Sequence, residues 1–211
     1  MQQGRQTGVG SALAVGLVLG LAGCQLGSYG QSAPYHYSVE TPIRVTVPAN
    51  APSVIQQFRP FPPEHGRKTS GEHPGIDIYE ARNTPILAAA PGTFIAAYRE
   101  PSYGNRVVIT HSAGPQGVPI QTVYKHLNNR TVQKGDVVKR GQQIGGMGNT
   151  GILAAGIVHL HFELHEMHGT RAIPRDPHLF WANGPGRVTC FSPQQRFPHP
   201  NATLTYPVRC K

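Results

Sequence analysis

The chain carries the stretch HLHFEL at residues 159–164. Its two leucines and its phenylalanine alternate with polar residues, and this period of two predicts a β-strand with one apolar face. His159 and His161 then share the other face, about 6.5 to 7 Å apart at about 3.3 Å per residue. Two imidazoles on one strand face suit a site in which one binds a metal ion and the other contacts substrate or water.

Four further apolar clusters precede this stretch, and Pro-Gly, Tyr-Gly-Asn and Ser-Ala-Gly breaks separate them, as in short strands joined by turns. They occupy residues 85–90, 93–98, 106–110 and 121–124. The 211 residues include 25 Gly and 20 Pro, and only 14% are charged, a composition that favours short strands over long solvated helices. We therefore predict one domain with a mainly β, antiparallel β-sandwich-like core.

Two other patches contain residue types that bind zinc. In HPGID (residues 73–77), four residues of extended or turning chain bring His73 and Asp77 within reach of one ion, and Gly75 relieves steric crowding. In YKHL (124–127), His126 closes an apolar strand before a polar turn. A single histidine is more often structural than catalytic, so neither patch is decisive alone.

Taken together and in order, these patches resemble the lysostaphin-like, LytM-type zinc endopeptidases, which cut peptide cross-links of bacterial peptidoglycan. The resemblance covers most of residues 65–165. It runs through HPGIDI (73–78), PILAAAPGTFIAA (85–97), YGNRVVITH (103–111), YKHL (124–127), VQKGDVVKRGQQIGGMGNTG (132–151) and HLHFEL (159–164). The resemblance implies a β core of the LytM, or duplicated hybrid motif, type.

The same resemblance assigns roles to five residues. It implies that His73, Asp77 and His161 hold Zn²⁺, and that His126 and His159 form the catalytic pair, without saying which of the two is the general base. Three protein ligands leave a fourth position for water or substrate, which distinguishes a catalytic zinc site from a closed structural one.

One segment departs from the family pattern. Residues 152–158 read ILAAGIV, where the family usually has a shorter and more polar segment. Because this apolar loop directly precedes the catalytic strand, we expect it to reshape or narrow the substrate groove.

The N-terminal residues read as an export signal, with Arg5 before an uncharged run at residues 9–22. The run ends in Leu-Ala-Gly-Cys, which resembles the lipobox of bacterial lipoproteins, so we expect cleavage after residue 23 and acylation of Cys24 as a membrane anchor. The alternative is a plain secretory signal with an incidental cysteine. Gln25 rather than Asp follows, which resembles lipoproteins at the periplasmic face of the Gram-negative outer membrane.

The remaining cysteines, Cys190 and Cys210, form an even pair in an oxidising compartment. We predict a disulfide that ties down a Pro-rich tail with no evident core; two unpaired thiols are the alternative. We expect a signal peptide at 1–23, a linker with a docking strand at 24–51, the zinc endopeptidase domain at 52–182 and a C-terminal extension at 183–211.

The formal net charge of +9 favours anionic partners. Cell-wall polymer, that is peptidoglycan, and anionic lipid head groups fit this charge. Nucleic acid does not, because an exported protein rarely meets it and no basic run is interleaved with aromatic residues.

The other polar residues near the patches have plainer interpretations. A HExxH metal motif is excluded because Phe162 follows His161. Glu163 shares the strand face of His161, so it either bonds to that ligand or is a solvated carboxylate. We expect structural or surface roles for the rest, with a groove wall as the alternative for the first: His111, Tyr103, Asn105, His165 and His168.

Three functions remain to be compared. The first is a zinc endopeptidase acting on peptidoglycan cross-links. The second is a non-hydrolytic activator of a cell-wall amidase, as in relatives that have lost ligands, although every ligand remains here. The third is a swinging-arm carrier, because residues 132–147 resemble the turn-rich segments of biotinyl and lipoyl domains, but no lysine for modification follows at the expected distance.

Overall fold

The structure is a computed structural model that describes residues 28–35, 42–60, 71–114, 116–197 and 203–211. The predicted signal peptide and the predicted lipidation site at Cys24 lie outside these residues. Within them, no helix combines the length and the apolar character needed to cross a membrane.

The described chain is built almost entirely from β-strands, with two short 3-10 helices, η1 and η2. The strands are β1 (Val54–Gln56), β2 (Ile76–Ile78), β3 (Pro85–Leu87), β4 (Gly92–Glu100), β5 (Gly104–Ala113), β6 (Pro119–Leu127), β7 (Asn129–Arg130), β8 (Val137–Val138), β9 (Gln143–Gly146), β10 (Leu160–His168) and β11 (Arg171–Arg175). The helices are η1 (Ile152–Ala154) and η2 (Pro177–Leu179). The four apolar clusters of the sequence fall on β3 to β6.

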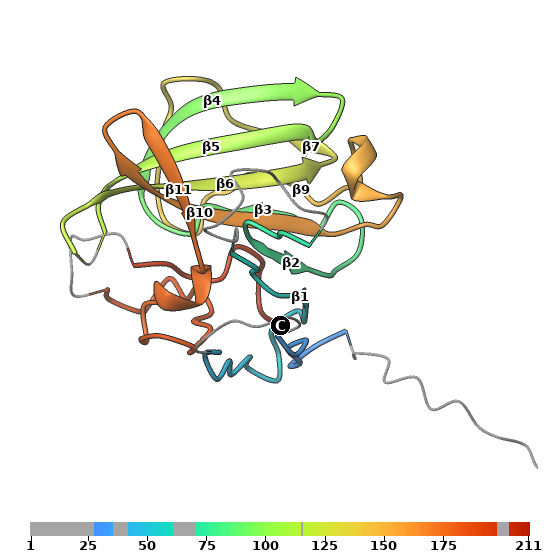
Figure 1. Ribbon diagram of the computed structural model, residues 1–211, viewed down its shortest axis with the longest axis vertical. Coiled ribbons are helices and arrows are strands. Elements are labelled where there is room, and N and C mark those ends of the chain that lie inside the picture. Colours follow the sequence, from blue (N-terminus) through green and yellow to red (C-terminus); the bar gives the residue numbers. More distant parts are fainter. Residues whose placement is uncertain (1–27, 36–41, 61–70, 115, 198–202) are drawn as a thin grey trace, which may run out of the picture.

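Two antiparallel sheets organise these strands (Figure 1). The larger has the order β1-β2-β10-β6-β5-β4-β8, with β11 paired to the far part of β10. The smaller has the order β3-β9-β7. The prediction of a mainly β, antiparallel fold is confirmed, and the stretch HLHFEL lies in and directly before β10, in the middle of the larger sheet.

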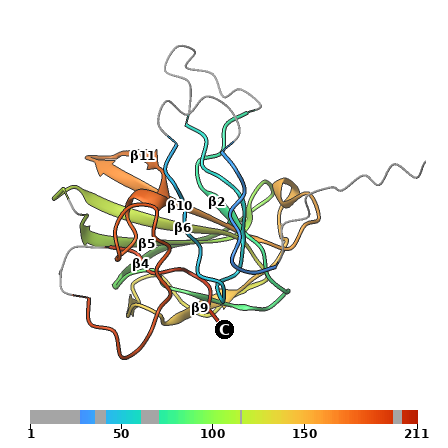
Figure 2. The same cartoon turned by 90° about the horizontal axis from the view of Figure 1, so that it is seen from below.

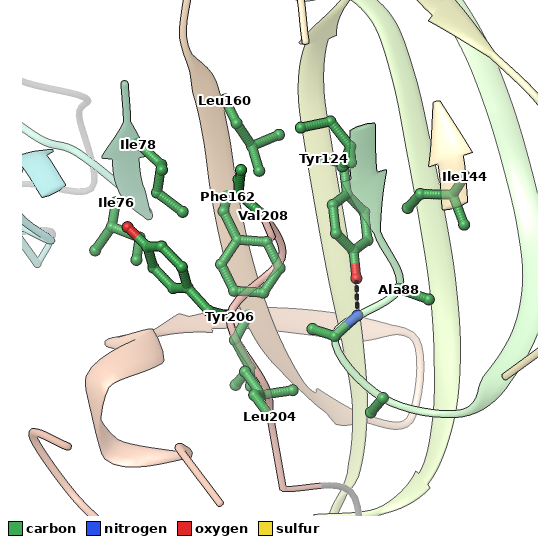
Figure 3. Packing of buried hydrophobic residues seen from close by; sticks show 14 of the residues in the cluster. Ile76, Ile78, Ala88, Tyr124, Ile144, Leu160, Phe162, Leu204, Tyr206 and Val208 are labelled. Carbon is green, nitrogen blue, oxygen red and sulfur yellow. Dashed lines mark hydrogen bonds between the residues drawn. The ribbon is translucent and has the colours of Figure 1, made fainter. Parts of the chain in front are cut away.

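One hydrophobic core joins the two sheets. Tyr124 on β6, Phe162 on β10 and Ile144 on β9 are all fully buried in the same cluster. The rings of Tyr124 and Phe162 lie 5.2 Å apart, and the Tyr124 hydroxyl accepts a hydrogen bond from the backbone N–H of Ala89 at 2.9 Å (Figure 3). The side chains of the smaller sheet thus cover the apolar face of β10.

The C-terminal tail enters this core, contrary to the expectation that it lacks one. Leu204, Tyr206 and Val208 are fully buried in the hydrophobic cluster that also contains Phe162 (Figure 3). The tail also adds to β3, because the N–H of Leu87 donates to the carbonyl of Pro207 at 2.8 Å. Sequence reasoning missed this because three apolar residues alternate over only five positions, one of which is a proline, and such a pattern is too short to be distinctive.

The predicted disulfide between Cys190 and Cys210 is present. It closes a loop of the C-terminal segment, and both cysteines pack against the hydrophobic core. The bond therefore fastens a tail that is already anchored by its buried side chains.

The segment before β2 runs beside it, as the blue and cyan parts of Figure 2 show. Val54 and Gln56 of β1 pair with Ile78 and Asp77 of β2. In the region expected to dock, Thr46 forms an isolated bridge with Arg187 of the C-terminal segment. The residues on both sides of the domain thus pack together, while the domain boundaries themselves stay a prediction.

Candidate metal centre

The structure brings His73, Asp77 and His161 together at the junction of β2 and β10. Asp77 lies on β2 directly opposite His161 on β10, and His73 lies in the turn before β2. Gly75, in that turn, has no room for a side chain, because a Cβ there would stand 2.3 Å from the backbone oxygen of Phe162. This close approach brings the turn against β10 and His73 within reach of His161.

Three ligand atoms form a small buried triangle. Nε2 of His73 lies 3.1 Å from Oδ1 of Asp77 and 3.0 Å from Nδ1 of His161, and that Nδ1 lies 2.9 Å from Oδ1 of Asp77. Zinc bonds of about 2.0 to 2.1 Å at tetrahedral angles separate neighbouring ligands by about 3.3 Å. The triangle is close to one face of such a tetrahedron, so the donor set fits zinc.

Hydrogen bonds behind the triangle fix the tautomer of each imidazole. Nδ1–H of His73 donates to the backbone carbonyl of Gln57 at 2.7 Å, and Nε2–H of His161 donates to Oε1 of Glu163 at 2.8 Å. The other nitrogen of each ring therefore presents its lone pair to the centre of the triangle. Of the two alternatives for Glu163, the structure shows the bond to His161.

The charges of the centre favour a cation. Burial alone would raise the pKa of Asp77, but hydrogen bonds from His161 and His73 outweigh it and hold that pKa well below its usual value. Burial alone would lower the pKa of His161, but the bonds to Asp77 and Glu163 raise it to about 9. A positive charge, whether a proton or a metal ion, is therefore stabilised at this place.

His159 and His126 lie next to the triangle, and both are buried. Nε2 of His159 is 3.8 Å from Oδ1 of Asp77. The ring of His126 is centred 4.9 Å from that of His159 and 6.0 Å from that of His161. The two residues expected to form the catalytic pair are thus neighbours of each other and of the ligands.

Both of these histidines use Nδ1 to hold themselves in place. Nδ1–H of His159 donates to the carbonyl of Ile157 at 3.0 Å, and Nδ1–H of His126 donates to the carbonyl of Thr150 at 2.9 Å. Each keeps an Nε2 lone pair for chemistry. Burial lowers the pKa of His126 to about 4, so its ring is neutral at pH 7 and able to accept a proton.

His126 occupies an unusual backbone conformation, with φ at 64°. The strand pairing of β5 with β6 is irregular at this point, where Asn105 pairs with Leu127 but Val107 pairs with Tyr124. A non-glycine residue at positive φ inside a bulge costs energy and redirects its side chain, features that concentrate at functional sites.

The apolar loop at 152–158 contains η1 and is directly tied to the centre. Ile152, Leu153 and Ile157 are exposed, and the carbonyl of Ile157 is the acceptor that holds His159. The loop is anchored at its start, where the N–H groups of Ile152 and Leu153 donate to the carbonyls of residues 101 and 102. The loop therefore positions His159 and also carries exposed apolar side chains.

Sequence reasoning missed Lys125. Its Nζ lies 2.5 Å from Oε1 of Glu163 and 3.7 Å from the centre of the Tyr103 ring, and the residue is buried. Burial lowers the pKa of Lys125, and the charge of Glu163 opposes that shift. Lys125 stands directly opposite His161 in the pair of β6 and β10. A single sequence does not reveal this register between strands, so it gave no signal for Lys125.

The remaining candidates lie apart from the triangle or support it. Nε2 of His165 contacts Oε2 of Glu163 at 2.9 Å, whereas His168 is half-exposed near Glu166. His111 is buried between the carbonyl of Pro91 and the hydroxyl of Thr122, which agrees with the structural role expected for it.

Asn105 and Tyr103 support the end of β6. The side-chain amide of Asn105 donates to the carbonyls of Leu127 and Asn128, at 3.0 Å each. The carbonyl of Tyr103 accepts the N–H of His126 at 3.1 Å. The structural interpretation of these two residues agrees with their contacts.

Comparisons with known proteins point to one family. Residues 71–174 match the model of Peptidase family M23. Peptidoglycan DD-endopeptidase ShyA of Vibrio cholerae is 38% identical over 97 residues, which are 46% of this chain and 21% of the relative. The uncharacterized lipoprotein YgeR of Escherichia coli is 38% identical over 95 residues, 44% of this chain and 35% of the relative.

Among solved structures, the catalytic domain of the antimicrobial peptidase lysostaphin from Staphylococcus simulans is 30% identical, with a TM-score of 0.44, and the match covers 57% of this chain and 85% of that domain. The chain spans only about a fifth to a third of the two curated relatives. The matched region contains all five residues of the candidate centre. The chain therefore belongs to peptidase family M23, whose domain it carries at residues 71–174.

Proposed function

We propose that this protein is a zinc-dependent endopeptidase that hydrolyses peptide cross-links of bacterial peptidoglycan. The observation that carries the proposal is the complete set of five side chains, with three lone pairs converging on one point and two further imidazoles that keep Nε2 available. The family match and the DD-endopeptidase named among the relatives support peptidoglycan as the substrate.

The ligand set proposed for zinc is His73, Asp77 and His161. Two imidazoles and one carboxylate leave a fourth position for a substrate or water, as catalytic zinc sites require. When bound, zinc supplies Lewis acidity, which polarises a carbonyl group and makes water easier to deprotonate. The bonds that Gln57 and Glu163 accept keep the two imidazoles deprotonated on the nitrogen that faces the centre.

The proposed roles of His126 and His159 follow from their Nε2 atoms, which the hydrogen bonds at Nδ1 leave available. A neutral Nε2 accepts a proton from the attacking water, and the resulting imidazolium can return a proton to the leaving amine. A protonated ring beside the reacting carbonyl also stabilises negative charge on its oxygen. Because both Nδ1 atoms are held by backbone carbonyls, neither ring needs to rotate to act.

Digestion of purified peptidoglycan tests this function. The protein is incubated with sacculi, with and without a chelator, and with zinc added back, and the products are identified by mass. We expect peptide cross-links to be cut by the zinc-loaded protein alone and the chelator to stop cleavage. Release of no fragments by a protein that demonstrably contains zinc would contradict the proposal.

The same assay addresses the alternative of an amidase activator. In that case the protein would release nothing alone but would increase the yield of an added cell-wall amidase, whose products differ in mass because the stem peptide leaves the sugar. The intact ligand triangle favours the hydrolase.

We further propose that Cys24 is acylated and holds the domain at the periplasmic face of the outer membrane. The lipobox-like residues before Cys24 and the relative named as a lipoprotein support this. Mass spectrometry of the mature N-terminus and fractionation of Cys24→Ser test it: a soluble periplasmic variant is expected, and unchanged membrane association would contradict the anchor.

A further inference from the structure

The family-matched domain begins at residue 71, yet two of the three ligands are contacted by residues that precede it. The backbone of His73 pairs with that of Arg59: the N–H of Arg59 donates to the carbonyl of His73 at 2.8 Å, and the N–H of His73 donates back at 3.1 Å. Asp77 stands directly opposite Gln56 in the β1–β2 pair. A short stretch outside the domain is thus in register with both ligands.

Gln57 reaches His73 through its main chain. Its carbonyl accepts Nδ1–H of His73, the bond that turns Nε2 of that ring toward the ligand triangle. The Gln57 side chain is 2% exposed, and both of its polar atoms form hydrogen bonds. Its Nε2 donates to the hydroxyl of Ser32 at 2.6 Å and to the carbonyl of Ala33 at 2.8 Å. Its Oε1 accepts a hydrogen bond from Nε2 of His178 at 2.9 Å.

That network continues into the C-terminal segment. Nε1–H of Trp181 donates to Nδ1 of His178 at 2.9 Å, which fixes His178 as the tautomer that donates to Gln57. The side chain of Gln57 is therefore held by two other parts of the chain, residues 32–33 and residues 178–181, and both lie outside residues 71–174.

Gln56 reaches Asp77 through its side chain. With the amide oriented by its hydrogen-bond network, Oε1 accepts from the Arg59 guanidinium at 2.6 and 3.0 Å, and Nε2 donates to Oδ2 of Asp77 at 2.9 Å. Oδ2 is the oxygen that does not take part in the ligand triangle. A donor on Oδ2 fixes the rotation of the carboxylate and leaves Oδ1 for the metal.

We propose that Gln56 and Gln57 are positioning residues for the metal centre, so that the flanking segment is a working part of the site. This inference rests on the proposed zinc site. Gln57 sets the ring of His73, Gln56 sets the carboxylate of Asp77, and Glu163 within the domain does the same for His161. Each ligand then has one fixed partner behind it.

The test is metal affinity measured by chelator competition on the full-length chain, together with the visible absorption spectrum of the Co²⁺-substituted protein. Gln56→Met keeps the volume of the side chain but removes the donor to Asp77. We expect zinc affinity to fall about 10-fold or more and the Co²⁺ bands to shift. Gln56→Ala should give a similar loss, because the donor rather than the packing is the cause.

Gln121→Ala is the matched control. Gln121 is also a half-buried glutamine on a strand of the larger sheet, but it pairs with His165 rather than with a ligand, so zinc affinity and the spectrum should not change. Gln57→Met should weaken zinc binding by a similar factor and also lower Tm, because it leaves His178 without its acceptor.

Three outcomes are distinguishable. Weaker zinc binding in Gln56→Met with an unchanged Gln121→Ala supports the proposal. Wild-type affinity and an unshifted Co²⁺ spectrum in Gln56→Met overturn it while leaving the proposed function standing. A wild-type chain that binds neither ion overturns both.

Discussion

Buried histidines occur in two environments in this protein, and they behave in opposite ways. At the metal centre, His161 faces two carboxylates, and its pKa rises to about 9 despite burial. Elsewhere, burial lowers the pKa of His111 to about 4 and that of His178 to about 3. Their ring nitrogens meet only carbonyl, hydroxyl, amide and indole groups. Neighbouring carboxylates, rather than burial, decide which histidines attract a cation.

The largest effect should come from removing one histidine of each kind. We expect His161→Ala to abolish zinc content and peptidoglycan cleavage, because two ligands remain at an anionic site that needs three. His111→Asn should keep both and lose only stability, by about 1 to 3 kcal/mol, because buried hydrogen bonds are lost. Zinc content is measured by atomic absorption and stability by thermal unfolding. Peptidoglycan cleavage by metal-free His161→Ala protein would show that His161 and His111 do not differ in the way proposed.

The next effect concerns the carboxylate behind His161. Glu163→Gln should weaken zinc binding about 10- to 100-fold, because the neutral amide no longer holds Nε2–H as firmly. It should also cost about 3 to 5 kcal/mol of stability, because Lys125 stays buried without its partner. Chelator competition and urea unfolding measure the two effects.

The substitution Lys125→Met separates the effect on zinc affinity from the effect on stability. The double variant Lys125→Met with Glu163→Gln should regain most of the lost stability, since no unpaired charge remains, while its zinc affinity stays low. Recovery of zinc affinity in the double variant would show that Lys125, and not the bond from His161 to Glu163, matters for the metal.

Acid should destabilise the protein through the second kind of histidine. For His178 the folded-state pKa of about 3 lies below the ordinary value of about 6.5, so between these values the unfolded chain binds more protons. The contribution of His178 to the free energy of unfolding is therefore fully present above pH 6.5 and falls as the pH decreases. The loss down to pH 5 is roughly 2 kcal/mol for each buried histidine with such a lowered pKa. The raised pKa of His161 acts with the other sign and loses its contribution as pH rises toward 9.

Urea unfolding of chelator-treated protein at pH 6.5 and 5 measures this slope. His178→Gln should reduce the loss by about a third, because His111 and His126, whose pKa values are both lowered to about 4, still contribute. An identical slope in the variant would mean that His178 is protonated in the fold at pH 5, and the contrast between the two environments would disappear.

The smallest effect is expected at Thr122, whose hydroxyl lies 2.8 Å from Nε2 of His111. Thr122→Val leaves that nitrogen buried without a donor and should cost about 1 to 3 kcal/mol. Thr122→Ser keeps the hydroxyl and should cost less. Zinc content and cleavage should be unchanged in both, and loss of either would place His111 among the residues that matter for the site.

Local patterns predicted the parts of this molecule that depend on neighbouring residues. The alternation in residues 159–164 predicted the strand and the shared face of His159 and His161. The disulfide followed from an even cysteine pair. The order of the histidine patches, through a family resemblance, identified the residues that the fold brings together.

Contacts across the sheet were not predictable in the same way. Lys125 stands beside Glu163, and Gln56 beside Asp77, because of the register between strands that are distant in sequence. Leu204 is buried because side chains from other segments of the chain surround it in the hydrophobic core. Such contacts depend on relations between segments, which a periodic pattern within one segment does not contain.

The insertion of the tail into the core sets an order of events during biosynthesis. Tyr206 and Val208 pack in the cluster that also contains Ile76 and Ile78, the residues on either side of Asp77. Contacts between residues so far apart in sequence form late and slowly. A long loop must close first, and the conformational entropy lost in closing it is offset only when the contacts have formed. The residues of the candidate metal centre therefore reach their final packing only after the chain has been made through residue 208, and a shorter nascent chain lacks the finished centre.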